Sequence, residues 1–239
     1  MFTLQVDFAL SLRDDFNGIR IKDDNCTFAI NGQVFKPMRK PDGFYVFCGL
    51  GIDKIFLQVN HFHYHEYHEV FTLGSVDDAS YRIKEVRLCR KYSAMHKNCE
   101  WYEVTGHHLP ANSEVLAFAR MEDHSGNDII VDVDAESIRV MNSTSSPVSS
   151  LVGRRFTINL EDASTFFVTH KAPDMYKYYI KGGIPPPSEF QVLYAVYRSI
   201  IESDGTLFIP HITTESIFKF MYKERESDKW HSVSVVKGD

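Results

Sequence analysis

The sequence lacks any apolar run of the roughly 18 to 20 residues that a membrane-spanning helix needs. Its first residues, Met1 to Asp7, include an early acidic residue and no basic residue ahead of an apolar stretch, which is not the pattern of a secretory signal. Positive charge is also scarce, because 26 Lys and Arg face 32 Asp and Glu for a formal net charge of −6. Such a chain has no general attraction to phosphate backbones or anionic lipids. We therefore expect a cytoplasmic protein that binds neither nucleic acid nor membrane.

Cysteine is sparse, with four residues in 239, and none forms the CxxC pair that is typical of zinc or redox sites. A reducing compartment is expected to leave these cysteines as thiols. Cys48 follows Phe47 and Cys89 follows Leu88, and apolar neighbours of this kind favour small core residues over nucleophiles. The cysteines therefore predict neither a disulfide framework nor thiol catalysis.

Motifs of the common catalytic classes are missing. The sequence contains no Gly-x-Ser-x-Gly nucleophile elbow, no phosphate-binding loop ending in Gly-Lys-Ser/Thr and no Gly-x-Gly-x-x-Gly dinucleotide loop. Gly49-Leu-Gly51 begins like the last of these and then continues as Ile-Asp-Lys. We therefore expect a protein that is not an enzyme and that needs no cofactor.

Aromatic residues are abundant, with 18 Phe, 12 Tyr and 2 Trp. Polar and apolar residues alternate from Leu4 to Leu10, which is the period of a half-buried strand. The dipeptide Asn31-Gly32 separates two short apolar runs and is a strong signal for a tight hairpin. Further short apolar runs bounded by turn residues follow along the chain. The sequence predicts an all-β protein built from small sandwiches or barrels.

Two breaks in the pattern indicate domain boundaries. Residues 76–80 are polar, and Gly182 to Pro187 contains three consecutive prolines, which cannot donate to a strand ladder. We therefore predict a sandwich over 1–75, a β-rich domain over 76–184, and a C-terminal hairpin or small β domain over 185–239. Residues 190–201 are compatible with a helix, but four β-branched residues favour a strand.

The N-terminal third resembles a known family. Leu12-Arg-Asp-Asp-Phe-Asn-Gly18 supplies an early turn, and Lys40-Pro-Asp-Gly43 leads the aromatic run Phe44-Tyr-Val-Phe47. This arrangement resembles the transthyretin-like, or carboxypeptidase regulatory-like, β-sandwich over about residues 3–72. The resemblance implies a β-sandwich that serves as an accessory or binding module rather than as a catalyst.

A histidine-rich segment spans Asn60 to Glu69. If it is one strand, His61, His63 and His65 share a face at a spacing of about 6–7 Å and suit zinc, nickel or copper with a fourth ligand from elsewhere. His63-x-His65-x3-Glu69 also matches the first motif of cupins, although their second motif is absent. The alternative is that Phe62 and Tyr64 face the core while the histidines face solvent.

Two further groups of side chains are candidates for binding. Tyr176, Tyr178 and Tyr179 form an aromatic run that suits a protein interface or sugar stacking, unless Tyr176 and Tyr178 belong to the core. The alternating acidic row from Asp132 to Glu136 is compatible with calcium or acid–base chemistry, but such rows are more often solvated strand faces.

The patterns together favour a structural or adaptor protein that binds other protein subunits. Modules of this kind occur in multi-protein assemblies such as phage-tail-like contractile particles. Two alternatives stay open: a metal-binding protein or metal-dependent enzyme that uses His61, His63 and His65, and a carbohydrate-binding module that uses Tyr176 to Tyr179.

Overall fold

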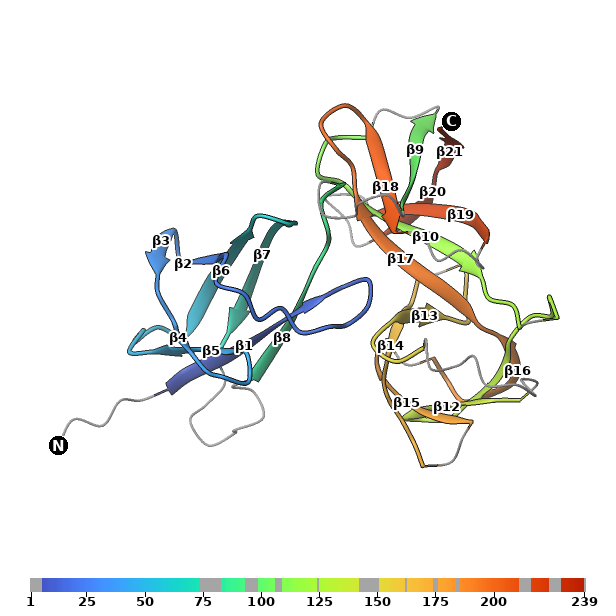
Figure 1. Cartoon of the computed structure of the whole chain (residues 1–239), viewed down its shortest axis with the longest axis horizontal. Coiled ribbons are helices and arrows are strands. Elements are labelled where there is room, and N and C mark those ends of the chain that lie inside the picture. The colour runs from blue at the N-terminus through green and yellow to red at the C-terminus, as the bar shows by residue number, and fades with distance from the viewer. Residues whose placement is uncertain are drawn as a thin grey trace. The chain divides into compact units, whose positions relative to one another are not determined.

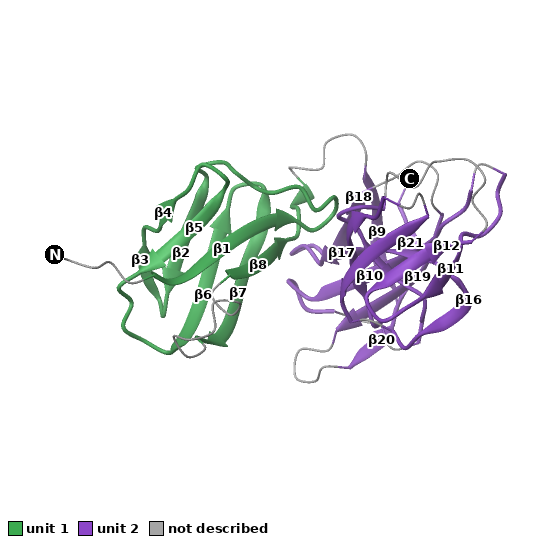
Figure 2. Cartoon of the chain, turned by 90° about the horizontal axis from the view of Figure 1, so that it is seen from below, with its two compact units in different colours: residues 1–94 green, residues 95–239 purple. Residues whose placement is uncertain are grey.

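The computed structural model describes the chain in eleven stretches, namely residues 6–73, 83–92, 99–105, 109–123, 125–141, 151–161, 163–173, 176–183, 185–210, 216–223 and 229–238. The regular structure in these stretches is almost wholly β, as the alternating sequence predicts. They contain no helix with the length and hydrophobicity needed to cross a bilayer. The chain divides into two compact units, Met1–Ala94 and Met95–Asp239 (Figure 2).

The first unit is a sandwich of two four-stranded sheets (Figure 1). One sheet has the order β4-β5-β1-β8, with β1 Val6–Asp14, β4 Met38–Arg39, β5 Phe44–Cys48 and β8 Ile83–Leu88. The other has the order β3-β2-β6-β7, with β2 Cys26–Ile30, β3 Gln33–Phe35, β6 Lys54–His61 and β7 Tyr64–Thr72. The predicted hairpin at Asn31-Gly32 is confirmed, because Ile30 pairs with Gln33 across it.

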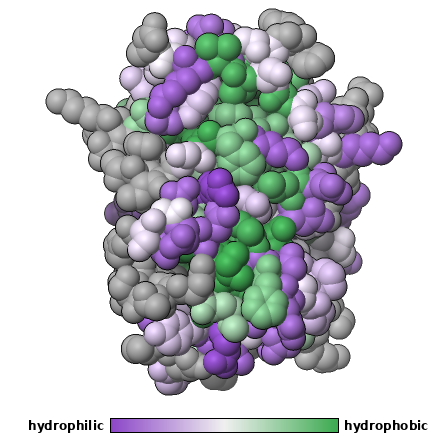
Figure 3. Space-filling view, turned by 90° about the vertical axis from the view of Figure 1, so that its right-hand side faces the viewer, coloured by the Kyte–Doolittle hydropathy of each residue, from purple (hydrophilic) through white to green (hydrophobic). Residues whose placement is uncertain are grey.

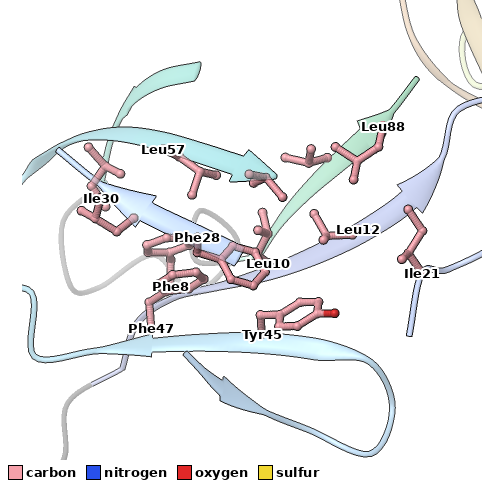
Figure 4. Packing of buried hydrophobic residues seen from close by; sticks show 13 residues of the cluster. Phe8, Leu10, Leu12, Ile21, Phe28, Ile30, Tyr45, Phe47, Leu57 and Leu88 are labelled. Atoms are coloured by element: carbon pink, nitrogen blue, oxygen red, sulfur yellow. The ribbon is translucent and has the colours of Figure 1, made fainter. Parts of the chain in front are cut away.

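The core of the first unit lies between its two sheets. Alternate residues of each strand point inward, so Phe8, Leu10 and Leu12 of β1 are fully buried. They meet inward residues of the facing sheet, such as Phe28 and Leu57 (Figure 4). This aromatic and aliphatic cluster accounts for part of the aromatic surplus in the sequence.

The predicted boundary at residue 75 needs correction. β8 pairs in parallel with β1, with Ala9 opposite Ile83 and Asp14 opposite Leu88. Val86 and Leu88 are buried in the same core as β1. The first unit therefore extends past the polar residues 76–80, which lie outside the described stretches.

The second unit contains a ten-stranded and a three-stranded sheet. The larger has the order β16-β11-β12-β15-β14-β13-β17-β10-β19-β20, where the strands are β10 Glu114–Arg120, β11 Ile130–Val133, β12 Ser137–Val140, β13 Arg155–Thr157, β14 Phe166–Lys171, β15 Lys177–Gly182, β16 Ser188–Val192, β17 Tyr194–Ile200, β19 Ser216–Lys223 and β20 Trp230–Ser232. The smaller has the order β18-β9-β21, with β9 Cys99–Thr105, β18 Thr206–Pro210 and β21 Ser234–Lys237. Figure 1 shows the small sheet at one end of this unit and β12, β15 and β16 at the other.

The predicted boundary at 184/185 also differs from the structure. β17 pairs with β10 along its whole length and with β13 on its other side, so the C-terminal segment completes the large sheet. The segment 190–201 is extended as predicted, with a break at Leu193 between β16 and β17. After β17 the chain turns at Asp204-Gly205, and β18 leaves the large sheet and pairs with β9.

Candidate functional site

The predicted histidine strand is in fact a hairpin. β6 ends at His61, Phe62 and His63 form the turn, and β7 begins at Tyr64, which pairs with His61. His61, His63 and His65 therefore do not share one strand face. His63 is exposed in the turn, while the backbone N–H of His65 donates to the carbonyl of Cys89 at 2.8 Å.

His61 is instead the buried centre of a different cluster. Its side chain is fully buried, and Nε2 lies 2.8 Å and 3.0 Å from the two carboxylate oxygens of Asp23. Its other ring nitrogen, Nδ1, accepts the backbone N–H of His63 at 3.0 Å. Because Nδ1 accepts, the single ring proton of the neutral imidazole is on Nε2 and is donated to Asp23.

Cys26 joins this cluster because β2 pairs with β6 in the register that places Cys26 opposite His61. The donor atoms of Asp23, Cys26 and His61 all lie within 4.8 Å of one another, and no other described residues form such a group. Burial raises the pKa of the Cys26 thiol to about 11, against the lowering effect of its hydrogen bond with Tyr45. The free thiol is therefore protonated at neutral pH and is a poor nucleophile.

Tyr45 closes the cluster from the facing sheet. Its hydroxyl donates to the backbone carbonyl of Asp23 at 2.9 Å. Burial, followed by the hydrogen bond with Cys26, raises the pKa of Tyr45. The ring thus holds the segment before β2 against the end of the sandwich.

The cupin-like motif is not assembled by the fold. Glu69 points toward β8, where its carboxylate accepts hydrogen bonds from Lys84 at 2.7 Å and from Tyr67. Lys84 also lies over the ring of Phe71, at 4.4 Å from the ring centroid. Glu69 is therefore an ion-pair partner that joins the two sheets rather than a partner of His63 and His65.

The outer edge of β7 is a second candidate site. Its start bonds to residues 89–91, but its later part, up to Thr72, pairs with no other strand among the described residues. Leu73 N–H donates to the carbonyl of Asp53 at 2.7 Å, just beyond the ladder that pairs Lys54 with Thr72. Antiparallel ladders alternate, so the odd-numbered residues from 67 to 73 bond to β6. Within the regular part of the ladder, the N–H and C=O groups of the even-numbered residues consequently point away from β6; these residues are His68, Val70 and Thr72.

Apolar side chains lie on the outer face of the same sheet. Phe56 pairs with Val70 across β6 and β7, and Val34 pairs with Ala29 across β3 and β2. Val34 is 87% exposed, Val70 53% and Phe56 37%. We call Phe56 and Val70, which lie opposite each other on neighbouring strands, the outer-face patch. Apolar side chains also reach the surface between hydrophilic ones on the face of the molecule shown in Figure 3.

The tyrosine run does not form one exposed surface. Tyr178 is fully buried, which corrects its prediction as a contact residue, whereas Tyr176 is 38% exposed. Tyr179 is half-buried, and its ring stacks on His170 with the centroids 4.5 Å apart. The alternation along β15 places neighbouring tyrosines on opposite faces, so a platform that needs all three is excluded.

Removing the hydroxyl of Tyr178 is expected to stabilise the protein. This oxygen is buried and has no hydrogen-bond partner among the described residues. A buried hydroxyl without a partner costs about 1–3 kcal/mol, so Tyr178→Phe should raise the free energy of unfolding by about 1 kcal/mol. Chemical denaturation monitored by tryptophan fluorescence measures this change in stability, because Trp101 and Trp230 both lie in the second unit with Tyr178. Tyr179→Phe is the control and should have little effect, and a loss of stability in Tyr178→Phe would contradict the expectation.

The acidic row has a structural role at one position. Asp132 accepts the backbone N–H of Phe190 at 2.9 Å, and Phe190 adopts a left-handed backbone with φ of 55°. Asp134 and Glu136 are exposed. The structure thus places only Asp132 against another strand. The histidine pair at 107–108 lies outside the described residues.

A cavity of about 720 Å³ lies between β9 and β19 in the second unit. Its charged side chains are already paired, since Glu100 accepts hydrogen bonds from Tyr102 at 2.5 Å and from Lys237. Lys219 donates to the carbonyl of Leu160. The three charged side chains that line this cavity, Glu100, Lys219 and Lys237, are therefore engaged within the chain.

No protein-family model, curated protein or solved structure matches the chain. The sites therefore rest on the geometry alone. Sequence reasoning found His61 but missed Asp23 and Cys26, because the pairing of β2 with β6 brings them together. It also missed the outer-face patch, although Phe56 and Val70 lie in strands whose alternation could have indicated outward apolar positions.

Proposed function

We propose that the protein is a non-catalytic structural or adaptor component that binds other proteins by accepting an extended partner segment along the edge of β7. One observation carries the proposal, namely the row of outward N–H and C=O groups from His68 to Thr72. A partner strand pairing there would extend the sheet of β3, β2, β6 and β7 by one strand.

The character of β7 supports this role. Natural edge strands are usually short, or carry lysine, proline or a bulge that blocks pairing. β7 is nine residues long and contains neither lysine nor proline. Its one register irregularity lies near its start, between the pairs of Val59 and His61, which leaves the ladder from Tyr67 to Thr72 regular.

The outer-face patch defines the partner that fits. Side chains of an added strand would lie beside Val70 and within reach of Phe56, on the same face of the sheet. The expected partner segment is therefore extended, with an apolar residue at every second position. The resemblance to transthyretin-like modules, which mostly serve as accessory domains, also supports an adaptor in a cytoplasmic multi-protein assembly, with phage-tail-like contractile particles as one such setting.

Blocking the edge is expected to abolish most of the binding. Val70 directs its N–H outward, so Val70→Pro removes one outward donor and leaves the ladder with β6 intact. Losing that hydrogen bond inside a paired interface should weaken binding by about tenfold to a hundredfold. Random peptides displayed on phage and selected against the full chain supply the ligands, and fluorescence polarisation measures their dissociation constants.

The matched control is Val34→Pro on the opposite edge of the same sheet. Val34 lies next to the hydrogen-bonded pair of Ile30 and Gln33, so its N–H also points outward. Both variants therefore carry the same substitution in the same kind of position, and thermal unfolding verifies that both fold. Equal binding by wild-type protein and Val70→Pro, or the absence of any enriched peptide, would rule out the edge of β7 as the binding site.

A further inference from the structure

The cluster at the end of the first sandwich carries the donor atoms of a metal site. We propose that Asp23, Cys26 and His61 bind a zinc ion, with one coordination position left open toward solvent. This site is independent of the edge of β7, and it differs from the set of three histidines that the sequence indicated.

The donor types suit zinc. A thiolate sulfur, an imidazole nitrogen and a carboxylate oxygen are its usual protein ligands, at about 2.3, 2.0 and 2.0–2.2 Å. In a tetrahedral site, ligand atoms at these distances are about 3.4–3.6 Å apart. The three donor atoms now lie within 4.8 Å of one another, and His61 Nε2 is 2.8 Å from Asp23. An ion therefore needs only a small opening between Asp23 and His61.

The surroundings hold the backbone of all three ligands in place. His61 and Cys26 face each other on paired strands, so their backbone positions are fixed by the ladder. Tyr45 fixes the segment that carries Asp23 through its bond to the backbone carbonyl. The Asp23 side chain is 43% exposed, which leaves a route for the ion and room for a water as the fourth ligand.

Zinc binding requires the ring proton of His61 to change its position. In the metal-free cluster the ring proton of His61 is on Nε2, which is the atom that would bind zinc. Binding moves this proton to Nδ1, and the hydrogen bond from the His63 N–H to Nδ1 must then break. His63 lies in an exposed two-residue turn, so this bond can be replaced by one to water.

Zinc binding also requires the Cys26 thiol to lose its proton. Cys26 is a free thiol, and zinc binds the thiolate, so zinc must displace the thiol proton into solvent. The ionisable groups around the cluster are His63, whose ring centroid is 5.8 Å from that of His61, Tyr45 with Arg39 beside it, and Tyr64 with Asp14 and Arg90 beside it.

The test is a titration of the chelator-treated full chain with zinc chloride. Isothermal calorimetry measures the binding, and native mass spectrometry measures the number of ions bound. One zinc per chain is expected. Cys26→Ser, which preserves the size of the side chain, should weaken zinc binding at least about a hundredfold, since a direct ligand matters at least as much as the partners around it. Cys48→Ser is the matched control, because Cys48 is equally half-buried but lies outside the cluster, and it should bind as the wild type does.

Cobalt binding distinguishes a cysteine that coordinates the metal from a cysteine that only supports the fold. Tetrahedral Co²⁺ bound to a thiolate shows a sulfur-to-metal charge-transfer band in the near ultraviolet, which should appear in the wild type and in Cys48→Ser and be lost in Cys26→Ser. Circular dichroism verifies that all three proteins fold. A chain that binds no zinc, or zinc binding that survives Cys26→Ser but is lost in His65→Ala, would overturn the proposal.

Discussion

Replacing Asp14 with alanine is expected to lower the free energy of unfolding of the first unit by about 3 kcal/mol. The Asp14 side chain is 4% exposed at the end of β1. One carboxylate oxygen accepts the backbone N–H groups of Phe16 and Asn17, at 2.9 and 3.3 Å. The other accepts Tyr64 Oη at 2.8 Å and Arg90 Nε at 2.5 Å. Alanine would leave a partly buried guanidinium and hydroxyl without this shared acceptor.

Hydrogen exchange measured by mass spectrometry tests this in the full chain. Protection should fall in peptides from β1, β6, β7 and β8, while tryptophan fluorescence reports the second unit as an internal reference. Asp14→Asn is the graded comparison, since it keeps an oxygen for the turn amides but loses the charge that pairs with Arg90. Equal stability of Asp14→Ala and wild type would show that this network contributes nothing.

Replacing Phe47 with alanine is expected to cost about 3–5 kcal/mol in the same unit. Phe47 is fully buried and stacks on Phe8, with ring centroids 4.4 Å apart and planes at 4°. Phe28 meets it edge-on at 5.6 Å, and Phe35 lies at 5.4 Å. Truncation removes these ring contacts and leaves a cavity that the paired strands cannot collapse to fill.

Two further variants test whether the loss of stability comes from lost packing in the core rather than from the removal of any aromatic ring. Phe47→Leu retains most of the volume and should cost about 1–1.5 kcal/mol. Phe56→Ala removes a ring from the exposed face of the facing sheet and should cost less than about 1 kcal/mol. Urea unfolding, monitored by hydrogen exchange, ranks the stabilities of the three variants. A loss of stability in Phe56→Ala as large as that in Phe47→Ala would contradict the assignment of the core.

Local structure was predictable where a single residue pattern decides it. The alternation near the N-terminus indicated β1, and Asn31-Gly32 indicated the first hairpin, since asparagine and glycine accept the left-handed backbone that such a turn needs. The turn at Phe62 and His63 was not predictable in this way. It contains neither glycine nor asparagine, so the histidine segment reads as one strand although it is two.

Pairing between distant strands was not predictable from the same patterns. Nothing in the residues of β8 specifies that it pairs with β1, and this pairing moves the end of the first unit from 75 to 94. The metal cluster depends on a similar distant pairing, because Cys26 and His61 are separated by the whole of β3 to β5. The transthyretin-like resemblance of the first unit stays a prediction.

The parallel pairing of β1 with β8 also sets the order in which the first unit can be completed during synthesis. β1 leaves the ribosome well before β8, its partner on that side, which ends only at Leu88. Until then the nascent chain presents one side of β1 as an open strand edge, with Leu10 and Leu12 incompletely covered. Non-local parallel pairing of this kind also folds slowly. A truncated gene product that stops near residue 75 would keep that edge permanently and should aggregate.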